Sequence, residues 1–334
     1  MINNKLKVGV IGSVKATEII LKCLNHHSFK NVKVWGYNPL IKENISGWVD
    51  LNIVSKKYHY EYEDFKKIND KELSIKSFKP ELLFIVGLSQ LVKKEILEIP
   101  KFGSIGFHPT VLPKGRGRAP LAWLILDKQK LGAATFFKIK DGIDNGPIIE
   151  QIFFDIKEND YVSDLDKKMI DAEILALERI LTNSNFPLIK GFDQDDRKAT
   201  FYGKRNPSDG LINWKENKED IISIIKACSK PHPGAFTYSE DNKIIIFKAK
   251  LSDIKFKGVI GRILKVNNKN SFIVQTGNGL IEILDWFCIN EEWVPKVGIL
   301  LGYSVQNEIF QLKRMCSELN NKLSKLENEE NIST

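Results

Sequence analysis

Glu81-Leu82-Leu83-Phe84-Ile85-Val86-Gly87 is the stretch of sequence that decides the fold class. A nearly continuous apolar run of this length is typical of a strand that is covered on both faces, as parallel strands are. Similar short runs occur at residues 6–12, 32–37 and 104–108, and apolar residues recur at helical spacing over residues 16–24. Residues 94–97 also have a helix-like pattern. The alternation predicts an α/β fold with a Rossmann-like, doubly wound and mostly parallel sheet.

The next part of the chain extends the same domain. Residues 113–120 contain four Gly or Pro residues and predict a loop, after which a helix starts at Leu121. Two strands are predicted at residues 133–139 and 147–154, and a long helix at residues 161–181. The polar stretch at residues 183–206 reads as a connection.

The pattern changes after this connection. A helix is predicted at residues 218–229, and short apolar runs follow, separated by Asn, Gly and Lys turns: residues 244–249, 258–265, 271–275 and 280–287. Such spacing predicts a smaller β-rich, OB-like domain. We therefore expect a catalytic domain over residues 1–204, a C-terminal β-rich domain over 205–305 and an amphipathic helix over 306–330.

The predicted last helix has a heptad pattern. Its apolar positions are separated by steps of 3, 4, 3, 4 and 3: Ile309, Leu312, Cys316, Leu319, Leu323 and Leu326. A helix this short is marginal alone, so it must pack on something. Packing on the chain itself and pairing in a homodimer both stay open.

Composition narrows the class of protein. The 334 residues are 43% apolar and 28% charged, as in ordinary globular proteins. No run reaches the roughly 18 apolar residues that a membrane helix needs, and the four widely spaced cysteines suggest neither a disulfide framework nor a metal site. We expect a cytoplasmic protein with no membrane insertion and no metal. The net charge of +8 comes from lysines spread along the chain, which argues against general nucleic-acid binding.

Chemistry-bearing residues are densest at residues 106–120, which read GFHPTVLPKGRGRAP. His108 stands where a strand ends and a loop begins, the place where open α/β sheets carry functional groups. Histidine is well suited to proton transfer near neutral pH, although a structural His bonded to a carbonyl is an open alternative. Arg116 and Arg118 follow, as bases for an anionic ligand or as plain surface residues.

A glycine-rich turn at residues 141–147 offers two acids, Asp141 and Asp144. An Asp held beside a His orients and polarises it. For each acid, a simple turn-forming role is the alternative.

These stretches resemble the signature of the methionyl-tRNA formyltransferase superfamily, roughly Asn-x-His-x-Ser-Leu-Leu-Pro-x-x-Arg-Gly followed by Asp-x-Gly. The matching residues here are His108, Leu112-Pro113, Arg116-Gly117 and Asp144-Asn145-Gly146. The resemblance extends to residues 80–96, 205–214 and 231–237 and covers nearly the whole chain.

The resemblance implies an enzyme that transfers a formyl group from N10-formyltetrahydrofolate to a primary amine. It implies His108 and Asp144 as catalytic residues. It implies folate binding by Gly87, Leu88, Ser89, Gln90, Leu91, Ile139 and Asp141, and substrate binding by Lys114, Arg116, Gly117 and Arg118.

One position departs from the family pattern. The Asn that the family places two residues before the His is Gly106 here, and loss of one oxyanion donor typically costs on the order of 100-fold in rate. We hypothesise that Ser104, Ser89, Gln90 or a backbone N–H replaces it.

The resemblance also bears on the acceptor amine. The wording Gly-Arg-Gly-Arg-Ala-Pro at residues 115–120 is similar to the branch that acts on UDP- or dTDP-linked amino sugars for surface glycans. Methionyl-tRNA formyltransferases usually carry a basic loop after the second strand, which binds the tRNA acceptor stem. The corresponding segment here, residues 38–57, contains no Arg, which argues against tRNA as the substrate. The alternatives are a methionyl-tRNA formyltransferase, or a folate- or nucleotide-sugar-binding module with little or no turnover.

Overall fold

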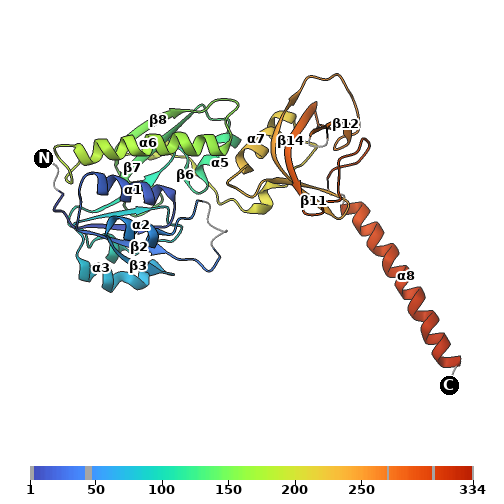
Figure 1. Ribbon diagram of the computed structural model, residues 1–334, viewed down its shortest axis with the longest axis horizontal. Helices are drawn as coiled ribbons and strands as arrows, with labels where there is room; N and C mark the ends of the chain where they lie inside the picture. The colour runs from blue at the N-terminus through green and yellow to red at the C-terminus, as the bar shows by residue number, and fades with distance from the viewer. Residues whose placement is uncertain (1–3, 42–46, 269–270, 303–304, 333–334) are drawn as a thin grey trace. The chain divides into compact units, whose positions relative to one another are not determined.

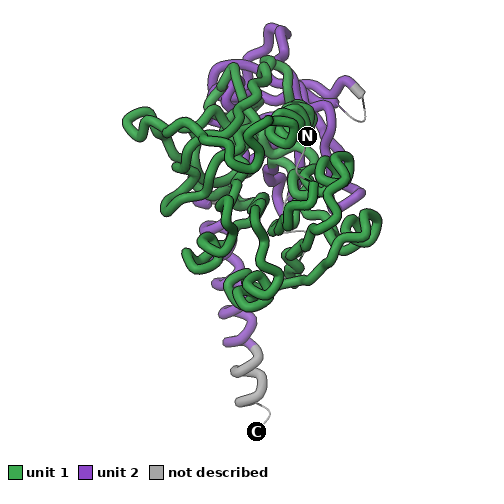
Figure 2. Tube along the Cα trace, turned by 90° about the vertical axis from the view of Figure 1, so that its left-hand side faces the viewer, with its two compact units in different colours: residues 1–210, 222–235 green, residues 211–221, 236–334 purple. Residues whose placement is uncertain are grey.

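A computed structural model describes residues 4–41, 47–268, 271–302 and 305–332 of the chain. Residues 42–46, which belong to the segment used above to argue against tRNA, lie outside this description. The chain forms two compact units, shown in different colours in Figure 2. Unit 1 contains residues 1–210 and 222–235, and unit 2 contains residues 211–221 and 236–334. The domain limits given above remain predictions.

Unit 1 is built on a seven-stranded sheet (Figure 1). Its strand order is β3-β2-β1-β4-β5-β7-β8. The strands are β1 (Val8–Gly12), β2 (Val32–Tyr37), β3 (Glu61–Phe65), β4 (Leu82–Val86), β5 (Ser104–His108), β7 (Leu131–Lys138) and β8 (Ile148–Asp155). The first five are parallel, whereas β7 and β8 run antiparallel to their neighbours. The predicted doubly wound, mostly parallel sheet is confirmed.

Helices cover both faces of this sheet. They are α1 (Lys15–His26), α2 (Leu51–Tyr58), α3 (Glu72–Phe78), α4 (Lys94–Leu97), α5 (Pro120–Leu126) and α6 (Val162–Thr182), with 3-10 turns at Ile68–Lys71, Asp196–Lys198 and Pro207–Gly210. One core cluster packs α1, α2 and α6 against one face through residues such as Leu24, Leu51 and Leu177. A second cluster packs α3 and α4 against the other face through Ile75 and Ile96.

Unit 2 contains a five-stranded antiparallel sheet, in the order β10-β11-β14-β13-β12. The strands are β10 (Ala235–Ser239), β11 (Asn242–Ser252), β12 (Ile263–Asn268), β13 (Ser271–Gln275) and β14 (Leu280–Cys288). The helix α7 (Lys218–Cys228) precedes them, with its first turn in unit 2 and the rest in unit 1, and α8 (Val305–Ile332) ends unit 2. The predicted β-rich region and C-terminal helix are confirmed. The strand predicted over residues 258–265 begins only at Ile263, because Gly261 adopts a positive φ of 81° just before it.

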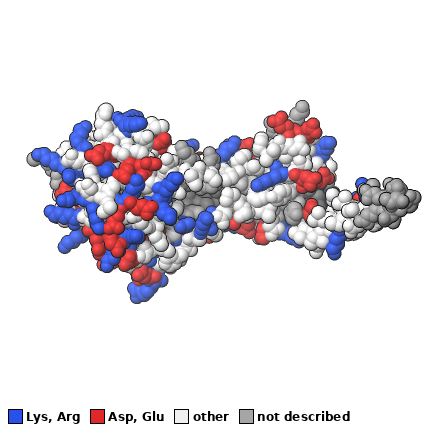
Figure 3. Space-filling view, turned by 90° about the horizontal axis from the view of Figure 1, so that it is seen from below, with Lys and Arg blue, Asp and Glu red and all other residues white. Residues whose placement is uncertain are grey.

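The surface carries both signs of charge. On the face drawn in Figure 3, Lys and Arg side chains are interspersed with Asp and Glu side chains. Across the described ranges, we find no helix that combines the length and the apolar character needed to cross a membrane. All four cysteines are free thiols.

Candidate functional site

The site is positioned by the carboxyl end of β5. His108 is the last residue of this strand and is only 5% exposed. Its Nε2 lies 2.7 Å from the carbonyl oxygen of Gly115. Because a carbonyl only accepts hydrogen bonds, Nε2 must carry a proton and donate. In the neutral ring, Nδ1 therefore has a free lone pair, and this atom lies 3.5 Å from Oδ2 of Asp144.

Asp144 comes from the loop between β7 and β8. It adopts a left-handed backbone conformation with a φ of 48°, which Asp tolerates better than most residues. Its Oδ2 accepts a hydrogen bond of 2.9 Å from the backbone N–H of Gly117. The carboxylate is thus held between the His108 ring and the loop that follows β5. The structure brings together the two residues predicted to be catalytic.

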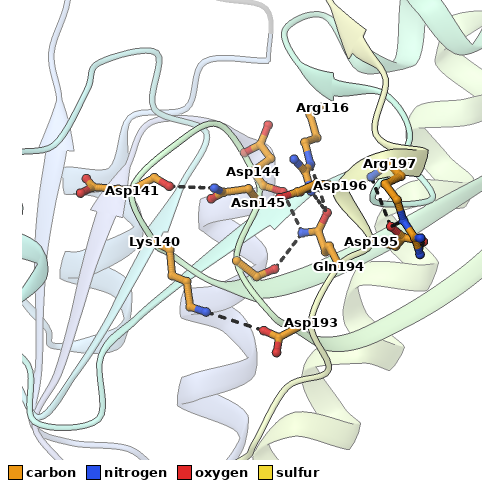
Figure 4. A network of polar contacts seen from close by, with 11 residues as sticks. Arg116, Lys140, Asp141, Asp144, Asn145, Asp193, Gln194, Asp195, Asp196 and Arg197 are labelled. Atoms are coloured by element: carbon orange, nitrogen blue, oxygen red, sulfur yellow. Dashed lines mark hydrogen bonds and ion pairs between the residues drawn. The ribbon is translucent and has the colours of Figure 1, made fainter.

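A partly buried polar network holds the Asp144 loop (Figure 4). The side chain of Gln194 donates to the carbonyl oxygens of Asp144 at 2.8 Å and Gly146 at 2.7 Å. Its Oε1 accepts from Nε and Nη2 of Arg116 at 3.1 and 2.8 Å. Sequence reasoning missed Gln194, because a lone Gln within a polar connection belongs to no motif.

The family resemblance predicts that Arg116 contacts the substrate, but in the structure its side chain contacts other residues of the protein. Its side chain is buried, and Nη2 pairs with Oδ1 of Asp196 at 2.7 Å in addition to the bonds to Gln194. These protein oxygens engage the Nε and Nη2 donors of the guanidinium. The structure therefore does not support a substrate contact through Arg116, and assigns it to fixing the loop. Lys114 and Arg118, by contrast, are exposed.

The loop after β5 is also held from its other side. Short strands β6 (Arg116–Gly117) and β9 (Phe201–Tyr202) pair in parallel. Gly117 has a φ of 111°, and a Cβ on it would lie 2.4 Å from the carbonyl oxygen of Tyr202, so only glycine fits here. The ring of Tyr202 stacks on Trp123, with ring centroids 5.7 Å apart. The loop carrying Gly115 and Gly117 is thus placed by packing as well as by hydrogen bonds.

Gly106 lies two residues before His108, so its Cα faces the same side of the strand. A Cβ at Gly106 would lie 2.7 Å from Cζ of Phe137 and 3.2 Å from Cγ1 of Ile139. The Phe137 ring therefore fills the space next to the strand where the family pattern has an Asn side chain.

Two of the three side chains proposed to replace that Asn are engaged elsewhere. The side chain of Gln90 accepts a hydrogen bond from the N–H of Ile68 and donates one to the carbonyl oxygen of Lys66. It therefore points toward the start of the 3-10 turn at Ile68–Lys71. The hydroxyl of Ser104 is directed to the carbonyl oxygen of Leu97 at 3.5 Å. Neither supports the hypothesis of a substitute donor.

The segment predicted to hold folate, Gly87–Leu91, follows β4, the parallel neighbour of β5. Leu88 and Ile139 pack against the same apolar cluster. The carbonyl oxygen of Ser89 accepts a 3.0 Å bond from Nη2 of Arg118, which links this segment to the loop after β5. Leu91 and Asp141 are exposed.

Two family models match the chain. The model described as "Formyl transferase" matches residues 7–181, and the one described as "Formyl transferase, C-terminal domain" matches residues 204–286. The chain belongs to the formyl transferase family.

Similar proteins carry several names within this family. Over 210 residues the chain is 35% identical to the bifunctional polymyxin resistance protein ArnA of Wigglesworthia glossinidia brevipalpis, covering 63% of this chain and 32% of that protein. It is 32% identical to the methionyl-tRNA formyltransferase of Syntrophomonas wolfei over 235 residues, which is 69% of this chain and 73% of that protein.

Solved structures share the fold of this chain. The N-formyltransferase of Helicobacter canadensis, in complex with folinic acid and dTDP-3-aminofucose, has a TM-score of 0.64 and 20% identity. The alignment covers 84% of this chain and 100% of that one. The roles of individual residues at the site stay predictions.

Proposed function

We propose that the protein transfers a formyl group from N10-formyltetrahydrofolate to the primary amine of a nucleotide-linked amino sugar, as a step toward surface glycans. The observation that carries the chemistry is the His108 ring, which is fixed at Nε2 by the Gly115 carbonyl and has Nδ1 3.5 Å from the Asp144 carboxylate. The folate-bound and dTDP-sugar-bound relative of the same fold supports the choice of donor and acceptor class.

The geometry supports His108 as the base in this reaction. The acceptor amine attacks the formyl carbon, a new C–N bond forms, and the bond from that carbon to folate N10 breaks. The amine must lose a proton, and the leaving N10 must gain one. Nδ1 of His108 is the ring nitrogen with a lone pair, so it accepts the amine's proton and later delivers it to N10. The negative charge of Asp144, 3.5 Å away, stabilises the imidazolium in between.

Negative charge also develops on the formyl oxygen during the attack. Gly106 offers no side-chain donor there, and Phe137 occupies the adjacent space. In this proposal the protonated His108 supplies the main positive charge near that oxygen, so His108 has two tasks.

The acceptor site would use the exposed bases of the loop after β5. Lys114 and Arg118 are both exposed and flank the buried Arg116. Their charges suit a nucleoside diphosphate, which carries several phosphate oxygens in a small volume.

A second acceptor deserves a direct test. Several sequence relatives at 30 to 32% identity are named methionyl-tRNA formyltransferases. Initiator methionyl-tRNA is therefore the competing substrate.

The test is a formylation assay with purified full chain and N10-formyltetrahydrofolate. The acceptors are a panel of UDP- and dTDP-linked amino sugars and, in parallel, charged initiator methionyl-tRNA. We expect a formylated sugar nucleotide, and loss of the product with His108→Ala. Formylation of the tRNA alone would assign the protein to the other acceptor. Folate binding without product on any acceptor would overturn the enzymatic proposal and favour a binding module.

A further inference from the structure

The C-terminal helix α8 exposes an apolar seam. Every described side chain from residue 309 to residue 325 is exposed. The seam positions Val305, Ile309, Leu312, Leu319 and Leu323 have exposed fractions of 59, 48, 57, 57 and 55%. An amphipathic helix gains most of its stability by burying its apolar face, so a seam of this length requires a partner. Figure 1 draws the helix, in red, at the C-terminal end of the chain.

The width of the seam indicates the kind of partner. Numbered as a heptad, Ile309, Cys316 and Leu323 take the a positions, and Val305, Leu312 and Leu319 take the d positions. The next residue of the same heptad pattern in the sequence is Leu326, at a d position. A helix that packs on a globular body presents a wider apolar stripe that includes e or g, whereas a strict a and d seam is typical of a coiled coil. Here the flanking e and g positions are polar, except for Met315. Among the described side chains of residues 305–325, Phe310 is the one large apolar residue on the outer face.

The flanking charges indicate which helix fits. In a parallel pair in register, each g residue faces the e residue of the next heptad on the partner helix. Glu308 at g then faces Lys313 at e, and Lys322 at g faces Glu327 at e. Each contact occurs twice by symmetry, and all are attractive. The described part of α8 carries Glu308 half-buried and Lys313 exposed, so both are accessible.

The antiparallel alternatives are less favourable. In an antiparallel pair, g faces g and e faces e. The alignments that overlap most of the seam then set Lys313 against Lys313 of the partner subunit, Lys322 against Lys322 of the partner subunit, or Glu308 against Glu329 of the partner subunit. Two of these alignments also bring opposite charges together, Glu308 against Lys322 of the partner subunit or Lys313 against Glu327 of the partner subunit. Each of the three nevertheless contains a like-charge contact, whereas the parallel pair forms four opposite-charge contacts and no like-charge one, so the charges favour the parallel pair. A second copy of the chain, aligned in parallel, satisfies both the seam and its charges.

We propose that α8 pairs with α8 of a second copy of this chain as a parallel, in-register coiled coil. The arrangement has a chemical signature. Cys316 is a free, exposed thiol at an a position, and in this register it faces Cys316 of the partner subunit across the axis. In any antiparallel register it faces an apolar d residue instead. The orientation is therefore readable by crosslinking.

The first experiment measures the mass of the full chain by sedimentation equilibrium in reducing buffer. We expect a dimer. Leu312→Glu combined with Leu319→Glu places charges in the seam and should weaken association on the order of 100-fold or more, because an unpaired charge would be buried in the coil. Ser317→Glu with Asn321→Glu adds the same charges on the outer face and should leave the dimer intact. A monomeric wild-type chain, or a dimer that survives the seam variant, would overturn the proposal.

Two further measurements test the register. Glu308→Lys should weaken the dimer, and the added change Lys313→Glu should restore it, because the second change turns the repelling pair back into an attracting one. Mild oxidation with diamide should remove two hydrogen atoms from the facing thiols, reduce the diamide to its hydrazine and join the chains through Cys316. Cys316→Ser should abolish the crosslink. A dimer without this crosslink, or one that Glu308→Lys does not affect, would contradict the parallel alignment.

Discussion

The imidazole of His108 is fixed at two points that define its protonation pattern. The carbonyl of Gly115 requires a proton on Nε2, and the carboxylate of Asp144 lies beside Nδ1. In the proposed mechanism, Nδ1 is therefore the atom that accepts the proton, next to the carboxylate of Asp144. Local sequence alone left a structural role open for both residues, and the family resemblance singled them out as the predicted catalytic pair.

The contacts that hold His108 and Asp144 in place could not be predicted from the sequence. Gln194 is 50 residues from Asp144 along the chain, yet it binds the backbone of the Asp144 loop. Arg116 reads as a surface base in a Gly-Arg-Gly-Arg stretch, but it is buried against Gln194 and Asp196. Whether an arginine faces a ligand or the protein depends on contacts between distant segments, which spacing alone does not contain.

Gly106 provides a prediction about packing. Gly106→Asn would place Cβ 2.7 Å from the Phe137 ring. We expect the variant to lose about 1–3 kcal/mol in the free energy of unfolding, as overpacked cores do. Urea denaturation followed by circular dichroism measures this. The pair Gly106→Asn with Phe137→Leu should recover most of the loss. If Gly106→Asn alone keeps wild-type stability, the ring does not fill that space.

At the scale of elements, α6 contains an unusual buried acid. Glu173 is fully buried on this helix, and neither of its carboxyl oxygens has a hydrogen-bond partner in the described structure. Burial, and then the negative charge of Asp166, raise the pKa of Glu173 well above its ordinary value of 4.5. Burial and the nearby Glu178 and Glu173 also raise the pKa of the Cys23 thiol to about 12. The folded protein thus holds Glu173 in its neutral form.

This acid predicts a pH-dependent stability. Below pH 4.5 the carboxyl is protonated in both the folded and unfolded states. Above it the unfolded chain releases the proton while the folded chain retains it, so the wild-type protein loses stability as the pH rises toward the folded pKa. Glu173→Met should therefore stabilise the protein by about 1–3 kcal/mol near pH 8, and by less near pH 5. Chemical denaturation at both pH values measures the difference.

The control for this prediction is Asp171→Met, which removes an exposed acid from the same helix. It should leave the pH dependence of unfolding unchanged. Equal pH dependence in the wild-type and Glu173→Met proteins would mean that Glu173 is not held neutral.

The elements themselves were predictable to different degrees. Strands β1, β2, β4 and β5 are apolar runs buried on both faces, so their sequence patterns are strong. The edge strand β3 reads EYEDF and has a single buried residue, Phe65, and the helices α2 and α3 are short, with eight and seven residues. Elements at an edge bury little apolar surface, so their sequences carry little periodic signal.

Over the whole molecule, the two parts of the chain follow one another in the order of the two formyl transferase family models. The family models match residues 7–181 and 204–286, so the α/β part and the β-rich part both belong to known formyl transferase regions. The two alignments cover 32% of the bifunctional relative and 73% of the methionyl-tRNA formyltransferase. Family membership alone therefore does not identify the acceptor.

The most direct test of the account compares formyl transfer by the wild-type protein and Asp144→Asn in single turnover. Asn keeps an oxygen for the Gly117 N–H but carries no negative charge to stabilise the His108 imidazolium. We predict a rate lower by on the order of 100- to 10,000-fold, with unchanged affinity for the folate donor. An unchanged rate would contradict the claim that the His108 and Asp144 pair carries the proton during formyl transfer.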